Sequence, residues 1–391
     1  MPSPRSALAV VPCLGALAFA GCCAPGSAGL EGMGPPPSSV VVIGSPPPPA
    51  SPGAAAPSAA SPSPSPSSSP AAIAASAEGS PPPAASEATP GRPLHLETQE
   101  ALLGLFTVRA LSEKELKRRG DPQIFLAKTI GPDTPARANQ GNPAMAHHAV
   151  SREACMAGLV ALTIQTPEQR AACGGAENMV PIYAHGDVSK AKTCIDVFEF
   201  PNRACELPFV WISPTQASVL CELEGKRLCV QEEWIKACRG DPEGKDDWIY
   251  AYGNELDLEV CNTNKPARSL GGPLCEPESA GSAWRTCSTN SEPAGSFPRC
   301  RSRFGVFDMH GNVAEIMTRL DPDGTVYSQL KGSAFFYVDV ARKHNERPPK
   351  DATRETYPDH CAHDPRWHVE PMDQAWHVNY HLGFRCCKSV K

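Results

Sequence analysis

Fourteen cysteines lie between residues 155 and 387, and no other feature of the sequence limits its possible folds as strongly. They stand at positions 155, 173, 194, 205, 221, 229, 238, 261, 275, 287, 300, 361, 386 and 387. An even number of cysteines in an exported chain predicts a disulfide framework. Zinc is the alternative, but structural zinc sites usually contain C-x-x-C pairs, and this sequence has none. Cys386 and Cys387 should bond to different partners, because a bond between neighbours is strained.

The N-terminus has the features of an export signal. Residues 1–21 carry one charge, Arg5, and an apolar run from Ala7 to Ala20, followed by Gly21 and Cys22. The run is too short to span a bilayer and is typical of a secretory signal peptide. Small residues before a cysteine resemble the bacterial lipobox, which implies acylation of Cys22 and attachment to a membrane of the bacterial cell envelope. The alternative is a plain cleaved signal in which Cys22 has no role.

Residues 22–92 are composed mainly of proline, alanine, serine and glycine, and many of the chain's 43 prolines lie in this segment. Such a composition buries too little apolar surface to offset the loss of conformational entropy on folding. We therefore expect a disordered tether, stiffened by proline, that holds a domain away from the membrane. The alternative is a tolerated insert with no role.

Residues 93–193 are predicted to be mostly helical. The apolar face of Leu102, Leu103, Phe106 and Leu111 favours a helix over residues 94–120. Ser151 and the run 154–162 open a second helical segment over residues 151–173, and the polar stretch 121–148 is predicted to be a loop. Cys155 and Cys173 could tie the second helical segment to the turn that follows it. His147 and His148 are expected to face solvent.

Residues 194–391 predict an α+β domain with many turns. Ser213, Pro214 and Gln216 form a capping box that opens a helix ending near Gly225. A second helix is predicted from Val230 to Gly240, and Cys221 and Cys238 could join the two helices. Short β-like runs cover residues 326–330 and 335–340.

Six sequence blocks over residues 194–387 resemble the formylglycine-generating enzyme family, the sulfatase-modifying factors. They occur in the family order and read Trp211-Ile212-Ser213 with Gly225-Lys226-Arg227-Leu228 and Glu233-Trp234, Tyr252-Gly253, Gly295-Ser296-Phe297-Pro298, Phe304 to Glu315, Gly332-Ser333, and Gly383-Phe384-Arg385. The resemblance implies a loop-rich variant of the C-type lectin-like fold.

In family members that oxidise a sulfatase cysteine to formylglycine, two cysteines that bind copper as thiolates follow the Gly-Ser motif. Here the two positions fall on Phe336 and Ala341, which cannot ligate a metal. Formylglycine generation is therefore not expected, and neither copper nor iron is expected as a cofactor.

The family resemblance also implies a structural calcium ion in the turn 308–315. Its ligands would be side-chain oxygens of Asp308 and Glu315 and backbone carbonyls of Gly311 and Val313. Oxygen ligands of this kind suit a hard ion. A second family site would begin at Asn262. The alternative is a turn held by its own hydrogen bonds.

Alternating residues near the C-terminus suggest a different metal hypothesis. If residues 367–370 and 376–381 are strands, His368, Glu370, His377 and His381 share one face. Two histidines and one carboxylate are the ligands of a non-haem iron site. The alternative is a solvated strand face.

These observations favour a lipid-anchored, non-catalytic binding or scaffolding module whose ligand is a protein, peptide or glycan. An oxidase or non-haem metal enzyme of the wider family is the alternative. The net charge, 36 − 42 = −6, and the absence of a basic stripe exclude nucleic acid as a partner.

Overall fold

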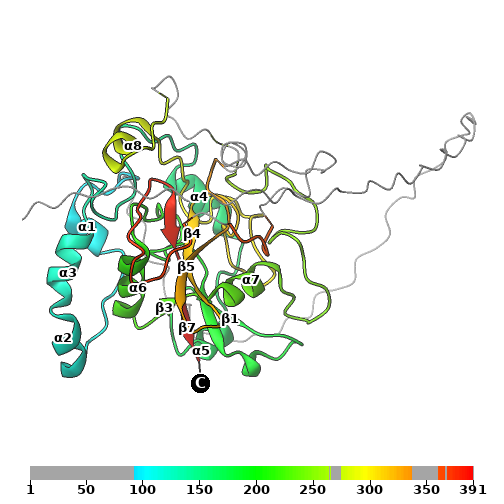
Figure 1. Ribbon diagram of the computed structural model, residues 1–391. Coiled ribbons are helices and arrows are strands. Elements are labelled where there is room, and N and C mark those ends of the chain that lie inside the picture. The colour runs from blue at the N-terminus through cyan, green and yellow to red at the C-terminus, as the bar shows by residue number, and fades with distance from the viewer. Residues whose placement is uncertain (1–91, 264, 266–273, 337–359, 366–367, 391) are drawn as a thin grey trace, which may run out of the picture. The chain divides into compact units, whose positions relative to one another are not determined.

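Two small sheets carry the fold, and strands from distant parts of the chain meet in both (Figure 1). The first sheet has the order β1-β2-β7-β3, with antiparallel neighbours: β1 (Met179–Ile182), β2 (Thr193–Asp196), β7 (Cys386–Ser389) and β3 (Arg227–Leu228). The second has the order β5-β4-β6: β5 (Val326–Lys331), β4 (Ala314–Leu320) and β6 (Leu382–Phe384). Strand β4 pairs antiparallel with β5 and parallel with β6. Only Arg385 separates β6 from β7, so the C-terminal segment joins the two sheets.

This computed structural model describes residues 92–263, 265, 274–336, 360–365 and 368–390. The predicted signal peptide, Cys22 and the tether lie outside the described residues, as does Ala341. None of the described helices is long and apolar enough to cross a membrane.

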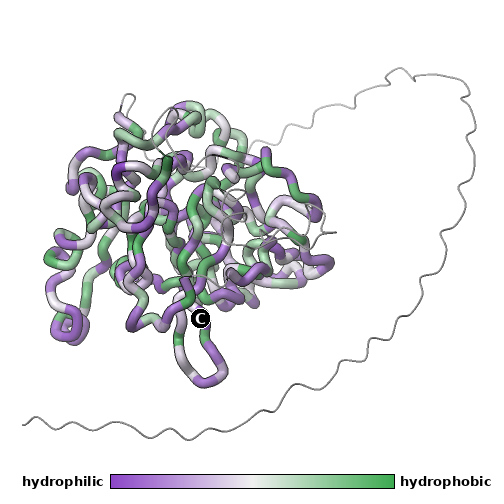
Figure 2. The backbone as a smooth tube through the Cα atoms, turned by 45° about the horizontal axis from the view of Figure 1, so that its top comes forward, coloured by the Kyte–Doolittle hydropathy of each residue, from purple (hydrophilic) through white to green (hydrophobic). Residues whose placement is uncertain are grey.

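Short helices surround the sheets. Those before β1 are α1 (Gln99–Leu103), α2 (Glu113–Arg119), α3 (Pro122–Thr129), α4 (Arg152–Leu159) and α5 (Pro167–Ala172). Those after it are η1 (Val188–Lys190), α6 (Pro214–Leu223), α7 (Gln231–Arg239) and α8 (Ala280–Thr286). In Figure 2, hydrophobic stretches run through the middle of this arrangement and many outer turns are hydrophilic.

The two helices predicted from capping signals are confirmed. Ser213 accepts a hydrogen bond from the backbone of Gln216, and the Gln216 side chain accepts one from Ser213 N, so α6 begins where the capping box places it. Helix α7 lies between Val230 and Gly240, as expected.

Three other expectations agree with the structure only in part. The stretch 121–148 contains α3, which begins at an Asp121 cap followed by Pro122, a helix signal that the polar composition obscured. The helical segments 94–120 and 151–173 are each split into two short helices. The strand expected at residues 335–340 does not begin at Phe335, because Phe335 and Phe336 lie in a turn, and residues 337–340 lie outside the described residues.

One core joins the N-terminal helices to the C-terminal strands. Leu102 of α1 and Ile130 after α3 are buried in the same cluster as Trp211 and Phe384. The described residues all belong to one compact unit, so the structure shows no domain boundary at residue 193 within them.

All fourteen cysteines of the framework are paired, which confirms the disulfide prediction. The seven bonds are Cys155–Cys205, Cys173–Cys194, Cys221–Cys386, Cys229–Cys387, Cys238–Cys361, Cys261–Cys300 and Cys275–Cys287. As expected, the neighbours Cys386 and Cys387 have different partners. Successive side chains of a strand point to opposite faces, so β7 is stapled on one face to α6 and on the other to the residue after β3.

The two pairings suggested from helix position are wrong. Cys155 bonds to Cys205 rather than to Cys173, and Cys221 bonds to a strand cysteine rather than to Cys238. Residues close in sequence did not pair, because each helix turns its cysteine toward a distant segment that packs against it.

Candidate functional site

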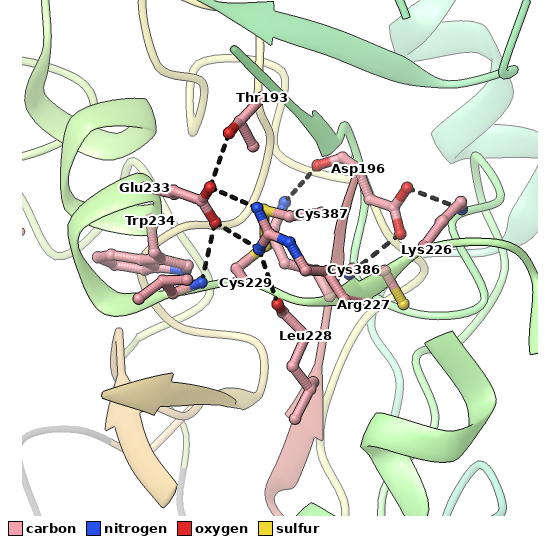
Figure 3. The surroundings of a disulfide bond; sticks show 12 residues. Thr193, Asp196, Lys226, Arg227, Leu228, Cys229, Glu233, Trp234, Cys386 and Cys387 are labelled. Atoms are coloured by element: carbon pink, nitrogen blue, oxygen red, sulfur yellow. Dashed lines mark hydrogen bonds and ion pairs between the residues drawn. A yellow bond between two sulfur atoms is a disulfide. The ribbon is translucent and has the colours of Figure 1, made fainter. Parts of the chain in front are cut away.

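The family signature around β3 and α7 forms a network of ion pairs rather than an open site (Figure 3). Arg227 donates to both oxygens of Glu233, at 2.7 and 2.6 Å, and Thr193 donates to Glu233 at 2.7 Å. Burial raises the pKa of Glu233, but these hydrogen bonds outweigh it and hold the pKa below its usual value. Beside them, Lys226 pairs with the buried Asp196 at 2.8 Å. These residues hold β3 and α7 against β2, so this part of the family signature has a structural role.

The turn 308–315 and the loop at Asn262 are brought together by the structure. Gly311 has φ of +75°, and a Cβ at this position would lie 2.2 Å from the carbonyl oxygen of Asn262. Only glycine therefore fits here. Asn312 N donates to the same carbonyl at 2.9 Å, and Asn262 Nδ2 donates to Asn312 Oδ1 at 3.0 Å. Two of the sequence-predicted calcium regions thus share one place in the fold.

Glu315 is held by a buried arginine. Arg385 Nε donates to Glu315 Oε2 at 2.6 Å, and Arg385 Nη2 pairs with Oε1. The indole N–H of Trp234 donates to Oε2 at 2.8 Å. Arg385 is 0% exposed and also donates to backbone carbonyls, one of them that of Phe307 at 2.9 Å. Both oxygens of Glu315 are therefore engaged by donors.

Two more buried carboxylates surround this pair. Glu199 accepts hydrogen bonds from Asn312 Nδ2 at 2.6 Å and Val313 N at 3.0 Å. Burial first, and then the charges of Asp308 and Glu315, raise the pKa of Glu199 well above its usual value. Burial also raises the pKa of Asp308 to about 7. Three acids thus face a single arginine.

Sequence reasoning missed Glu199. Glu199 stands between apolar residues in the run Val197-Phe198-Glu199-Phe200, and this was the available signal, because an acid there must be buried with partners.

The residues present fit calcium only in part. In this arrangement Glu315 does not fit a calcium ligand, because Arg385 and Trp234 occupy its oxygens. Asn262 Oδ1 does fit, since it is buried and has no hydrogen-bond partner among the described protein atoms. The calcium site predicted at Asp308, Gly311, Val313 and Glu315, and the second site predicted to begin at Asn262, stay predictions.

At the position of the first copper-binding cysteine, an aromatic ring fills the space. Phe336 is 4% exposed. Its ring stacks on Tyr380 with centroids 5.6 Å apart, and packs edge-on against His381 at 4.8 Å and Phe335 at 4.9 Å. This ring offers no ligand atom.

The histidine face predicted near the C-terminus is not formed. Residues 368–370 and 376–381 are not strands. The rings of His368 and His377 stack with their centroids 4.2 Å apart. Burial lowers the pKa of His377, and the electrostatic influence of Glu370 partly opposes this shift. His381 instead packs on Phe336. Among the described residues, none of these four side chains belongs to a group of three converging ligands.

His148 is not solvent-facing, although His147 is exposed as expected. The Nε2 atoms of His148 and His95 lie 2.7 Å apart, and burial lowers the pKa of both rings. The pair joins the segment before α1 to the loop before α4, a long-range contact with no local signal.

Comparisons with known proteins point to one family. The family model described as a sulfatase-modifying factor enzyme 1-like domain matches residues 168–390, more than half of the chain. The Mus musculus protein named inactive C-alpha-formylglycine-generating enzyme 2 is 26% identical over 186 residues, 47% of this chain and 50% of that protein. The Bos taurus protein of the same name is 30% identical over 110 residues, 28% of this chain and 32% of that protein. The chain therefore spans half or less of the length of these relatives.

Among solved structures, the crystal structure of CarF aligns with a TM-score of 0.28 and 15% identity, over 47% of this chain and 68% of that one. The Major Tropism Determinant U1 variant aligns with a TM-score of 0.26 and 8% identity, over 55% and 52% of the two chains. These TM-scores are too low to support a statement about function.

Proposed function

Because the chain belongs to the sulfatase-modifying factor family, we propose that it is a non-catalytic member that binds or scaffolds a partner outside the cytoplasm. The mixed helices and sheets with seven disulfides are consistent with the family's variant of the C-type lectin-like fold. The proposed partner is a protein, peptide or glycan.

The buried ring of Phe336 carries this proposal. Formylglycine formation in the family depends on two thiolates that bind copper, and Phe336 supplies an aromatic ring in place of the first. All seven disulfides lie elsewhere, and a disulfide sulfur is not a free thiolate. Two relatives named inactive support the same conclusion.

Seven disulfides indicate an oxidising compartment, which supports export. We propose that acylated Cys22 anchors the chain and that residues 22–92 form the stalk. Cys22→Ala should then release the protein into the soluble fraction. A variant that stays in the membrane fraction would remove the lipid anchor from this account.

An open cavity of about 460 Å³ beside α7 supports a binding role. Its lining includes Lys236 and Lys245 next to Glu232, with Ile235 as an apolar element. Charges of both signs suit a polar peptide or protein surface better than an apolar small molecule.

The direct test is incubation of the purified chain with a cysteine-containing sulfatase-motif peptide, with and without copper. We expect the peptide to stay intact, and mass spectrometry reads the outcome at the peptide cysteine. An aldehyde at that cysteine would overturn the proposal. Iron that co-purifies with the chain and is lost in His368→Ala would instead favour the oxidase alternative.

A further inference from the structure

A buried imidazole lies against the disulfide that joins α7 to the turn at residue 361. His310 Nε2 is 3.6 Å from the sulfur of Cys238 and 3.7 Å from the sulfur of Cys361. His310 and Cys238 are each 1% exposed, and Cys361 is 0% exposed. The function proposed above uses none of them.

We propose that reduction of the Cys238–Cys361 disulfide creates a site for one thiophilic metal ion, held by the two thiolates and the imidazole of His310. The ligand atoms already lie within 4.8 Å of one another. They come from α7, from the turn 308–315 and from the turn at residue 361, so the fold rather than a local motif assembles them.

The sulfur–nitrogen distances are those of a metal site. With metal–sulfur bonds of about 2.3 Å and metal–nitrogen bonds of about 2.0 Å at tetrahedral angles, the sulfur-to-nitrogen edge is about 3.5 Å. The observed edges are 3.6 and 3.7 Å. Only the two sulfurs must move apart for an ion to enter.

The imidazole is also in the tautomer that binds a metal. Ala251 N–H donates to His310 Nε2 at 3.0 Å, so Nε2 carries a lone pair and the ring proton is on Nδ1. Tyr250 and Tyr252 pack edge-on against the ring, with centroids 5.7 and 5.5 Å away. A metal at Nε2 would take the place of the Ala251 hydrogen bond.

The chemistry requires a dithiol reductant. Two electrons and two protons pass to the disulfide, the sulfur–sulfur bond breaks, two thiols form, and the reductant closes its own disulfide. The metal ion then displaces the two thiol protons to solvent. Thiolates select soft or borderline ions such as Cu⁺ and Zn²⁺ over Mg²⁺ and Ca²⁺.

The second group of converging ligands does not carry the same inference. Asp196, Glu224 and Cys386 surround Lys226, whose ammonium pairs with the two carboxylates at 2.8 and 3.0 Å. A cation already occupies that position.

The test begins with graded treatment of the purified chain with a dithiol, and differential alkylation with mass spectrometry locates the opened disulfide. Co²⁺ is then added as a spectroscopic probe, followed by Zn²⁺ and, as a control, Mg²⁺. We expect one Co²⁺ per chain, with a thiolate-to-cobalt charge-transfer band that Zn²⁺ abolishes and Mg²⁺ does not. His310→Ala should weaken binding by at least about tenfold with the same thiols exposed.

A Cys238→Ser, Cys361→Ser double variant is the matched control, because it keeps the other six disulfides. It should show no charge-transfer band under the same treatment. A band that persists in this variant, or equal affinity in His310→Ala and the wild type, would overturn the proposal. So would failure of the Cys238–Cys361 bond to open at any dithiol concentration that leaves the circular dichroism of the chain unchanged.

Discussion

The turn 308–315 and the segment 332–336 touch one another, yet they differ in what they keep of the family pattern. Gly311 N donates to Ser333 Oγ at 2.9 Å, and Phe335 N donates to Asn312 O at 3.2 Å. The turn retains charged family residues in a buried network. The segment keeps Gly332 and Ser333 and then places Phe336 where a ligand cysteine would stand.

The difference separates residues that hold the fold from residues that perform chemistry. A buried charge must keep its partner, since an unpaired one costs several kcal/mol. A ligand position has no such requirement, and an apolar ring that packs well can occupy it. The scaffold can therefore persist without the family's reaction.

Removal of Arg385 should give the largest effect. Arg385→Met leaves the buried Glu315 without its ion-pair partner, which is expected to lower the free energy of unfolding by about 3–5 kcal/mol. Denaturant unfolding measures this loss. The control is Arg319→Met, because Arg319 pairs with Asp321 at a partly exposed site where about 0–1 kcal/mol is expected. Equal losses in the two variants would contradict the assigned role of the buried network.

Truncation of Phe336 should come next. Phe336→Ala removes a ring packed on Tyr380 and His381 and should cost about 3 kcal/mol, while Phe336→Leu should cost less. Thermal unfolding of both variants measures this. If Phe336→Ala is as stable as the wild type, the ring does not fill the position as described.

The free energy of unfolding should also depend on pH through Asp308 in the turn 308–315. Because the pKa of Asp308 is raised to about 7 in the fold, this group is protonated in the native state and ionised in the unfolded state at intermediate pH. Its contribution to stability is therefore lost as the pH rises from about 4 to 7. The loss between pH 5 and 7 should be about 2 kcal/mol.

Asp308→Asn keeps an oxygen that can accept from Gly295 N but cannot ionise. Unfolding in calcium-free buffer at several pH values should show a flatter profile for this variant than for the wild type. Asp373→Asn, at an exposed position, should leave the profile unchanged. Parallel curves for Asp308→Asn and the wild type would show that Asp308 titrates normally.

Calcium should give the smallest effect, since Arg385 already engages Glu315. An ion that binds only the folded state stabilises it by RT ln(1 + [L]/Kd), about 1.4 kcal/mol at tenfold excess over Kd. A chelator should lower the melting temperature of the wild type and leave Asp308→Ala unaffected. The same response in both proteins would remove the site at Asp308.

Local signals in the sequence were sufficient for several elements. Helix α6 followed from Ser213, Pro214 and Gln216 because a capping box involves only four consecutive positions. The separate partners of Cys386 and Cys387 followed from covalent geometry. The ordered blocks from Trp211 to Arg385 were sufficient to identify the family.

Only the tertiary structure decided which distant residues meet. Cys221 and Cys386 are 165 residues apart in the sequence, and Glu199 and Val313 are 114 residues apart. No local sequence pattern predicts that the members of either pair are in contact. Likewise, no local pattern predicted that the ring of His381 packs on Phe336, which lies 45 residues earlier in the chain. Such contacts depend on how helices and strands pack, because backbone preferences act over a few residues whereas burial is satisfied by any complementary segment of the chain.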